Sequence, residues 1–360
     1  MSLLFEPLTI GTLALRNRLM RSATAERMAD PTSGIPLPRQ AALYRTLAEG
    51  GVGLIIAGHA YVDRRGKAHP EMASIAEDAA IPYWREAIRP AQEAGARLML
   101  QINYAGASCD PAVTAESLSP SGIAPDGCPP SRPMTDAEVR AIVRAYGEAA
   151  RRTRAAGFDG VQIHGAHGYL VTQFLTPCTN RRDDAWGGDA ERRRAFLAAV
   201  IAEVRRQVGP DYPVWIKLGV AGDEASGLTV EEGAAAAAEC FRHGVACVEV
   251  SHGRGTPAAY AGREEASFLP MARAVRRAVG PEAPLALVNG FRTRETMERV
   301  LDEGVVQLIS LCRPLIVEPD LPKRMQIGAA DATRCVRCRR CWPEEIGMGI
   351  RCNNRQVQGR

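Results

Sequence analysis

The sequence predicts an α/β fold: one (β/α)8 TIM barrel followed by a short cysteine-rich extension. Short runs rich in Val, Ile and Leu alternate with amphipathic helical patterns, as expected for buried parallel strands covered by helices. Eight such repeats occur with no second domain between them, which favours closure into a barrel. Of the 360 residues, 46% are apolar, which is enough to build a large core.

The predicted strands recur along the whole barrel region. They cover Arg18–Ala23, Val52–Gly58, Arg97–Ile102, Gly160–Gly165, Val214–Gly219, Ala246–Ser251, Leu285–Gly290 and Gln307–Cys312. The clearest helical patterns lie at Arg39–Glu49, Tyr83–Glu93, Asp136–Ala156, Ala190–Val208, Val230–His243, Leu269–Val279 and Arg294–Glu303. Thr135 with Glu138, and Thr229 with Glu232, have the spacing of capping boxes at helix starts.

The predicted domains are residues 1–328, the barrel, and residues 329–360, the cysteine-rich extension. The second choice of fold is a doubly wound open sheet. It is disfavoured because no glycine-rich dinucleotide fingerprint follows an early strand. The longest insertion, Ser108–Pro133, is rich in Pro, Ser and Gly and is expected to form a lid or an ordered loop.

Composition and charge narrow the function classes. The net charge of +4 is spread along the chain, and runs such as Glu191–Arg194 resemble solvated helix faces rather than a nucleic-acid surface. No stretch reaches the ~20 apolar residues of a membrane helix, and the N-terminus lacks a signal-peptide pattern. We therefore expect a cytoplasmic protein acting on a small-molecule substrate, a homo-oligomer with neither nucleic acid nor membrane as partner.

Active sites of such barrels lie at the carboxyl ends of the strands. The ends of the last two predicted strands suit a phosphate, because Gly290 lets backbone amides approach and Arg313 can form a forked contact. A tight turn with a surface arginine is the alternative. Lys217 inside a strand needs an anionic or electron-rich partner, which could equally be a reduced flavin edge or Glu249.

The end of the fourth predicted strand carries the most specific pattern. His164 and His167 are three residues apart and could clasp a substrate oxygen. Tyr169 could deliver a proton, since an ordinary tyrosine has a pKa of about 10 and stays protonated at neutral pH. Structural histidines or a metal site are the alternatives, although no third histidine or carboxylate lies nearby in sequence.

The segment Phe158–Gly188, FDGVQIHGAHGYLVTQFLTPCTNRRDDAWGG, closely resembles the signature of the old yellow enzyme family. Three further segments resemble that family's first, third and eighth strand motifs: LFEPLTIGTLALRNRLMRSA, LQINYAG and SLCRPLIVEPDLPKR. The resemblance covers nearly the whole chain. It implies an FMN-containing barrel.

The resemblance also implies residue roles. Gln101 would bind the flavin pyrimidine, Lys217 the N1/O2 edge, and Arg313 with Gly290 the phosphate. His164 and His167 would hold the substrate's activating oxygen, with Tyr169 as the proton donor. The other cofactor-binding positions that it implies are Ala23, Thr24, Ala25, Gly58, His164, Asn289 and Cys312.

The chain departs from the family pattern at several positions. Tyr104 and Ala107 replace the usual His and Arg of the third-strand motif, and Cys312 replaces a Gly. Ala25 and Arg27 stand where relatives often carry a flavin-tuning Cys or Thr and a substrate-facing Tyr. These departures leave the expected FMN contacts in place and alter the substrate pocket.

A C-x2-C-x2-C-x10-C pattern follows the barrel, and its members are Cys335, Cys338, Cys341 and Cys352. This spacing suits a [4Fe–4S] cluster or a structural zinc site, and three close cysteines with one distant favour the cluster. The segment resembles the cluster-binding stretch of trimethylamine dehydrogenase and 2,4-dienoyl-CoA reductase. Because the chain stops eight residues after Cys352, we expect no built-in NAD(P)H domain. Electrons would come from NAD(P)H at the barrel mouth or from an electron-donor protein.

The expected function is an FMN-dependent transfer of hydride to an activated C=C of a small organic substrate. One alternative is a dehydrogenase of amines or saturated substrates. Another is an electron-transfer subunit carrying FMN and an iron–sulfur cluster. A third is a flavin-free lyase or isomerase with a structural zinc.

Overall fold

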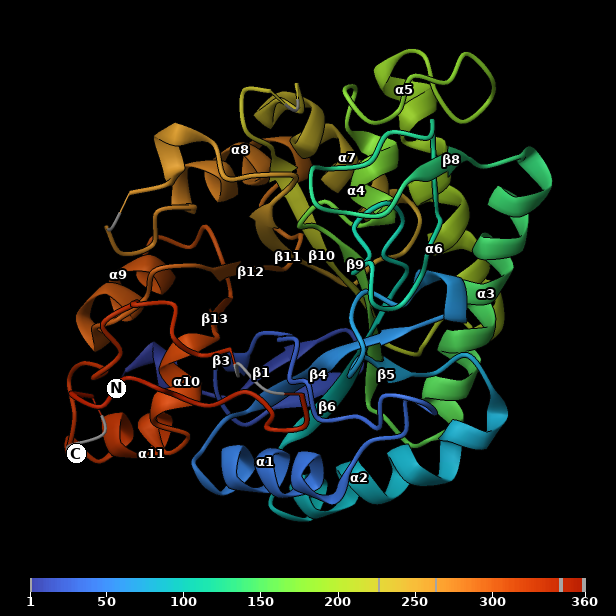
Figure 1. Cartoon of the computed structure of the whole chain (residues 1–360). Coiled ribbons are helices and arrows are strands. Elements are labelled where there is room, and N and C mark those ends of the chain that lie inside the picture. The colour runs from blue at the N-terminus through green and yellow to red at the C-terminus, as the bar shows by residue number, and fades with distance from the viewer. Residues whose placement is uncertain (1, 226, 263, 343–345, 358–360) are drawn as a thin grey trace.

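Eight parallel strands close into a barrel in the computed structural model, which describes residues 2–225, 227–262, 264–342 and 346–357 (Figure 1). Each strand pairs with the next, and the last pairs with the first. The barrel strands are β3 (Leu19–Arg21), β4 (Leu54–Tyr61), β6 (Arg97–Asn103), β9 (Gly160–Gly165), β10 (Val214–Ala221), β11 (Cys247–His252), β12 (Leu285–Val288) and β13 (Leu308–Leu311). The predicted barrel is confirmed, and the open-sheet alternative is wrong because β13, β3 and β4 complete the ring.

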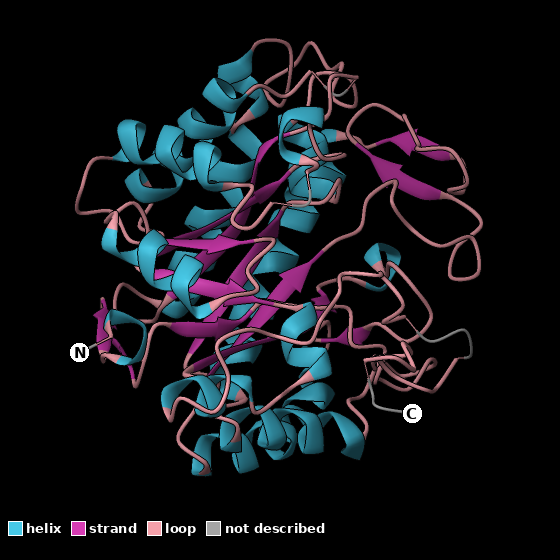
Figure 2. Cartoon of the chain, turned by 90° about the vertical axis from the view of Figure 1, so that its left-hand side faces the viewer, coloured by secondary structure: helices cyan, strands magenta, loops and turns pink. Residues whose placement is uncertain are grey.

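Helices form the outer layer around the strands, as Figure 2 shows. They are α1 (Pro38–Glu49), α2 (Ile81–Glu93), α3 (Asp136–Ala155), α4 (Leu170–Leu175), α5 (Ala190–Arg193), α6 (Ala195–Val208), α7 (Val230–Arg242), α8 (Leu269–Val279), α9 (Arg294–Asp302), α10 (Arg313–Val317) and α11 (Leu321–Gln326). The capping box at Thr135 and Glu138 is present in full. The helix predicted over Ala190–Val208 is instead two helices, α5 and α6, that meet at Arg194.

A hairpin of β1 (Leu8–Ile10) and β2 (Leu13–Leu15) closes the amino-terminal end of the barrel. Its apolar side chains pack against residues that begin the barrel strands, including Leu54, Trp215 and Leu308. Because this end is filled by side chains, the opposite end of the barrel is left for a site.

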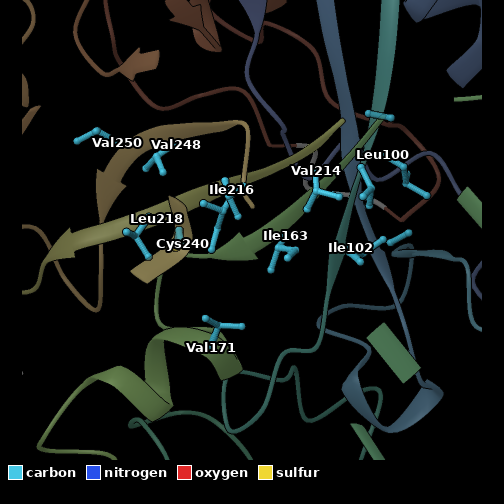
Figure 3. Packing of buried hydrophobic residues seen from close by; sticks show 14 of the residues in the cluster. Leu100, Ile102, Ile163, Val171, Val214, Ile216, Leu218, Cys240, Val248 and Val250 are labelled. Carbon is cyan, nitrogen blue, oxygen red and sulfur yellow. The ribbon is translucent and has the colours of Figure 1, made fainter. Parts of the chain in front are cut away.

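Alternation along β10 separates the apolar layer from the polar interior. Ile216 and Leu218 pack outward with Ile163 of β9 and Val171 of α4 (Figure 3). Lys217 lies between them and therefore points to the opposite face, into the barrel. Burying each large aliphatic side chain contributes roughly 1.5–3 kcal/mol, so this layer stabilises the strands that carry the polar interior.

The remaining short elements lie in the loops. They are β5 (Ala73–Ser74), β7 (Ser117–Ser119), β8 (Ser131–Pro133), η1 (Leu3–Phe5), η2 (Arg64–Gly66), η3 (Asp78–Ala80) and η4 (Ala258–Tyr260). β7 and β8 pair within the long insertion, which is an ordered loop. None of the helices in the described ranges has the length and apolar character that crossing a membrane requires.

The cysteine-rich segment packs along the loop that follows β3, next to α10 and α11 (Figure 1). The Ile350 amide donates to the Glu26 carbonyl at 2.9 Å, and the Thr333 amide donates to the Arg292 carbonyl at 2.9 Å. The Gly347 amide donates to the Glu71 carboxylate. These contacts place the extension against the wall of the barrel mouth.

Candidate active site

A cavity of about 250 Å³ lies at the carboxyl ends of the strands. It brings together seven predicted site residues: Ala23, His167, Lys217, Asn289, Gly290, Cys312 and Arg313. A larger hollow of about 910 Å³ lies against the outer face of α9, lined by charged side chains such as Arg294 and Glu298. We assign the site to the smaller cavity because the strand ends converge there.

Lys217 lies on the floor of this cavity within a buried polar network. Its Nζ donates to Ser22 Oγ at 2.6 Å and lies 3.4 Å from Glu249 Oε1. Both Ser22 and Ser310 donate to the same carboxylate, at 2.7 and 2.6 Å. The predicted alternative partner of Lys217, Glu249, is therefore present, and the ammonium group still lines the open cavity.

Gln101 reaches the same network through a neighbouring strand. Its Nε2 donates to Gln162 Oε1 at 2.8 Å, and Gln162 Nε2 donates to Glu249 Oε2 at 2.9 Å. β6, β9, β10 and β11 thus present one continuous chain of side-chain hydrogen bonds beneath the cavity. Such a network fixes the orientation of each member, because any rotation would leave a buried polar group unpaired.

The ends of β12 and β13 carry the residues that were predicted to bind a phosphate. Asn289 and Gly290 both have left-handed backbone, with φ of 93° and 87°. A Cβ at Gly290 would lie 2.9 Å from the Glu264 carbonyl oxygen, so glycine permits the close turn. Within the described residues the Arg313 guanidinium, which is partly exposed, makes no hydrogen bond. This cation is free to meet an anionic group.

The loop after β3 packs closely on β4. The Thr24 hydroxyl lies 3.2 Å from Cys312 Sγ. A Cβ at Gly58 would lie 2.2 Å from the Thr24 carbonyl oxygen, so β4 can approach this loop only with glycine there. Ala25 and Gly58 line a second, small cavity, which His59 and His69 also line.

Five of the six histidines gather at the mouth of the barrel. The ring centroids of His164 and His167 are 5.1 Å apart, and those of His167 and His252 are 4.7 Å apart. His59 lies 5.9 Å from His164 and 5.6 Å from His69. The two predicted histidines are therefore part of a larger cluster.

The whole cluster is neutral at pH 7. Burial, and then the charge of Lys217, lowers the pKa of His59 to about 4. Burial, followed by the neighbouring histidines, lowers the pKa of His164 well below its usual range. His167 lines the open cavity, yet desolvation by the surrounding protein, followed by the charge of His252, lowers its pKa well below the usual range. Neutral imidazoles can each donate one hydrogen bond and accept another.

Tyr169 stands at the start of α4 with its ring edge-on to His164, at a centroid distance of 4.8 Å. Burial raises its pKa to about 12, and the charge of Arg27 opposes this rise. The hydroxyl therefore keeps its proton across the physiological range and is suited to act as an acid.

The four C-terminal cysteines lie outside the cavity. Cys335, Cys341 and Cys352 are buried, whereas Cys338 is exposed. Burial raises the pKa of Cys341 to about 11, with smaller contributions from the charges of the other three and of Cys312. The thiols are thus within electrostatic range of one another. Among the described residues, however, no set of three or more His, Cys, Asp or Glu side chains is arranged to hold a metal.

The sequence interpretation missed His59, His69 and His252. His59 falls within the β4 run and His252 ends β11, so both obey the strand-end rule that identified the others. His69 belongs to a loop, and no periodic signal marks it. Ser22 and Ser251, which bond Lys217 and His167, also lacked a signal because serines are common at strand ends.

The chain is similar to several known proteins. The model of the NADH:flavin oxidoreductase / NADH oxidase family matches residues 3–332. The chain is 33% identical to "Metal reductase" of Desulforamulus reducens over 94% of this chain and 51% of that protein. It is 32% identical to "NADH oxidase" of Thermoanaerobacter brockii over 99% of this chain and 56% of that protein. The chain thus spans about half the length of these two relatives.

Among solved structures, an old yellow enzyme homologue from Zymomonas mobilis is similar to this chain, with a TM-score of 0.80 and 25% sequence identity. The match covers 93% of this chain and 95% of that one.

Proposed function

Because this chain belongs to the NADH:flavin oxidoreductase / NADH oxidase family, we propose that it reduces an activated C=C of a small organic substrate with FMN as its cofactor. The chain is a flavin-dependent oxidoreductase of the old yellow enzyme type. One observation carries the finer proposal: the cavity at the strand ends is lined by the cations Lys217 and Arg313 and by His167, whose ring adjoins that of His164, which in turn adjoins Tyr169.

The residues at the mouth fit FMN. Arg313 offers an unbonded guanidinium for the phosphate, beside Gly290, Asn289 and Cys312. Lys217 and Gln101 would meet the pyrimidine edge from the buried network. The other residues that we assign to the flavin are Ala23, Thr24, Ala25, Gly58 and His164. FMN, when bound, supplies the hydride, while the protein supplies orientation and electrostatics.

His164 and His167 would bind the carbonyl or nitro oxygen that activates the substrate. The Ala166 amide donates to His164 Nδ1 at 3.2 Å, so that nitrogen is an acceptor and the proton lies on Nε2. His164 therefore has its N–H donor on Nε2. Tyr169, protonated and edge-on to His164, would transfer its proton to the carbon next to the one that receives hydride.

We further propose that residues 1–328 form the FMN barrel and residues 329–360 an iron–sulfur extension. Cys335, Cys338, Cys341 and Cys352 would hold a [4Fe–4S] cluster, with zinc as the alternative. The charges of the other cysteines contribute to the pKa shifts of Cys335 and Cys341, so the four thiols lie near one another, which supports this assignment. Reducing equivalents would come from NAD(P)H at the mouth or from a donor protein. We also expect the protein to be cytoplasmic and to form a homo-oligomer. Light scattering would test the oligomeric state.

The first experiment is an absorbance spectrum of anaerobically purified protein with iron, sulfide and zinc analysis. Flavin bands with about four irons per chain are expected. Colourless protein containing only zinc would instead favour the flavin-free barrel. Anaerobic mixing with NADH or NADPH, followed by cyclohex-2-enone, tests the reaction itself.

The second experiment targets the paired imidazoles. Replacing both His164 and His167 with alanine should weaken binding of 4-methylphenol, because each ring contributes a hydrogen bond of about 1 kcal/mol or more. The flavin spectrum reports ligand binding directly. An unchanged titration in this double variant would reject the role assigned to the pair.

A further inference from the structure

Large apolar side chains are exposed on the cysteine-rich segment. Among the described residues, six large apolar side chains are exposed, and four of them belong to this segment: Val336, Trp342, Ile346 and Met348. Their exposed fractions are 56%, 48%, 65% and 39%. Exposed apolar side chains that gather in one region and have polar neighbours are typical of a contact with another molecule.

The excess positive charge of the chain lies on the same segment. Charged residues occur along the whole chain, but residues 334–357 contain six arginines, two glutamates and neither lysine nor aspartate. Their net charge of +4 equals that of the complete chain, so all the other residues together are neutral. Arg339 and Arg340 are exposed, and neither guanidinium forms an ion pair or a hydrogen bond within the described residues. Both cations are therefore available to an anionic partner.

Backbone hydrogen bonds hold this surface in a defined shape. The Asn353 amide donates to the Arg340 carbonyl at 2.9 Å, and the Arg351 amide donates to the Cys341 carbonyl at 3.2 Å. Asn353 Nδ2 also donates to the Trp342 carbonyl at 3.3 Å. Two stretches of the segment thus lie side by side, and they carry Arg340 and Trp342 on adjacent positions.

A tight turn in this segment presents Cys338 to solvent. Arg337 and Arg339, on either side of it, have left-handed backbone with φ of 57° and 62°. Cys338 is the exposed member of the four C-terminal cysteines, whereas the other three are buried. Left-handed backbone in a non-glycine residue is costly and is found most often at functional sites.

The extension face is defined by six exposed side chains: Val336, Arg339, Arg340, Trp342, Ile346 and Met348. Its composition is that of a protein interface, because interface cores are enriched in Trp, Met and Arg and depleted in Lys and Asp. A second copy of the chain is a poor occupant, since a two-fold contact would bring the same arginines face to face. An acidic protein would complement the charge. The small size of the face suits a transient electron-transfer contact, which typically buries less than about 1,200 Å² in total.

We propose that the extension face is the docking site of a separate acidic protein that carries one electron at a time. This inference rests on the proposed function, because reduction of a C=C consumes reducing equivalents. Two encounters supply two electrons, each oxidising one carrier molecule, and solvent supplies the two protons that complete the reduction of one C=C. Arg339 and Arg340 steer the carrier to the face, and Trp342 excludes water from the contact.

The test measures binding of two acidic carriers, a plant-type ferredoxin and a flavodoxin, to the FMN-loaded protein by biolayer interferometry. At least one should bind at low salt and bind more weakly as salt rises, because salt screens exposed charges. Basic cytochrome c should not bind. The double variant Arg339→Gln with Arg340→Gln should weaken carrier binding by about tenfold or more, since interface arginines often dominate affinity. Arg339→Lys with Arg340→Lys should retain part of it, and Trp342→Ser should weaken binding at every salt concentration.

The matched control is Arg144→Gln with Arg277→Gln, which removes two positive charges from exposed positions on α3 and α8. Carrier binding should be unchanged in this variant. The iron content and the flavin spectrum, measured for every variant, check that the remainder of each protein is intact.

Four results would overturn the inference. They are failure of both acidic carriers to bind the wild type, an equal loss in the two glutamine double variants, tighter binding of anionic phospholipid vesicles than of either carrier, and a smaller mass in solution for the Arg339→Gln, Arg340→Gln variant, which would mark a contact between copies. Purified protein without FMN would instead refute the proposed function, and the flavin spectrum separates this failure from the others.

Discussion

Lys217 Nζ lies 3.4 Å from Glu249 Oε1 inside the barrel, where the two side chains are 3% and 0% exposed. The pair holds one positive charge at the cavity floor and balances it with one carboxylate that two serines also bond. A cation can be kept at this depth only because its partner lies on the adjacent strand in register.

Glu249→Gln should therefore destabilise the protein strongly. Removing one member of a buried ion pair leaves the other uncompensated, at a cost of about 3–5 kcal/mol. Urea unfolding of the purified protein would measure this. Glu203→Gln, which breaks an ion pair with exposed Arg206, should cost less than about 1 kcal/mol. Similar losses in the two variants would contradict the importance of the buried pair.

The histidine cluster should make the fold sensitive to mild acid. His59 has a pKa of about 4 in the folded protein, against 6.5 for an ordinary histidine. The unfolded chain therefore binds more protons between these values, and stability falls as the pH drops from 6.5 toward 4. His59 alone would contribute roughly 3 kcal/mol to this loss. Unfolding midpoints measured across this range should fall less steeply in His59→Gln, and parallel curves would argue against the mechanism.

Tyr169→Phe should slow substrate reduction while sparing flavin binding. General-acid catalysis contributes about 10²–10⁴-fold, so the rate of flavin reoxidation by an enone should fall by that order in stopped-flow measurements. Because the pKa of Tyr169 is raised to about 12, the wild-type rate should lack an alkaline limb from this group below about pH 10. A rate in the variant within twofold of the wild type would exclude Tyr169 as the donor.

Glu318 anchors the start of the extension. Its fully buried carboxylate accepts from Thr333 Oγ1 at 2.8 Å, Arg334 N at 2.6 Å and Arg334 Nε at 3.0 Å. Burial works against its charged form, yet these bonds prevail and lower the pKa of Glu318.

Glu318→Ala should loosen residues 333–341 and leave the barrel folded. Hydrogen exchange should speed up in that segment by about tenfold or more, since a charged hydrogen bond contributes about 1.5–3 kcal/mol. Exchange in β10 and β11 serves as the internal reference. Equal acceleration in the strands would mean that Glu318 supports the whole fold instead.

The sequence by itself determined the barrel, because buried parallel strands must be apolar on both faces and covering helices must be amphipathic. It also located Lys217, His164 and Tyr169, since strand ends converge on one rim in this fold. The sequence did not predict the boundary between α5 and α6, because the break at Arg194 leaves the helical period of the apolar residues intact.

Only the tertiary structure decided which polar groups share a space. His59, His69 and His252 are far apart in sequence, and their convergence with His164 depends on closure of the strands. The pairing of Lys217 with Glu249 needed the register of β10 and β11. The distance of 3.9 Å between Arg27 Nη1 and Glu71 Oε2 likewise depends on how two separate loops pack together in the folded protein. The periodicity of the sequence predicts which face of a strand or helix a side chain occupies. The protonation state and the hydrogen bonds of that side chain depend on neighbours that only the fold brings together.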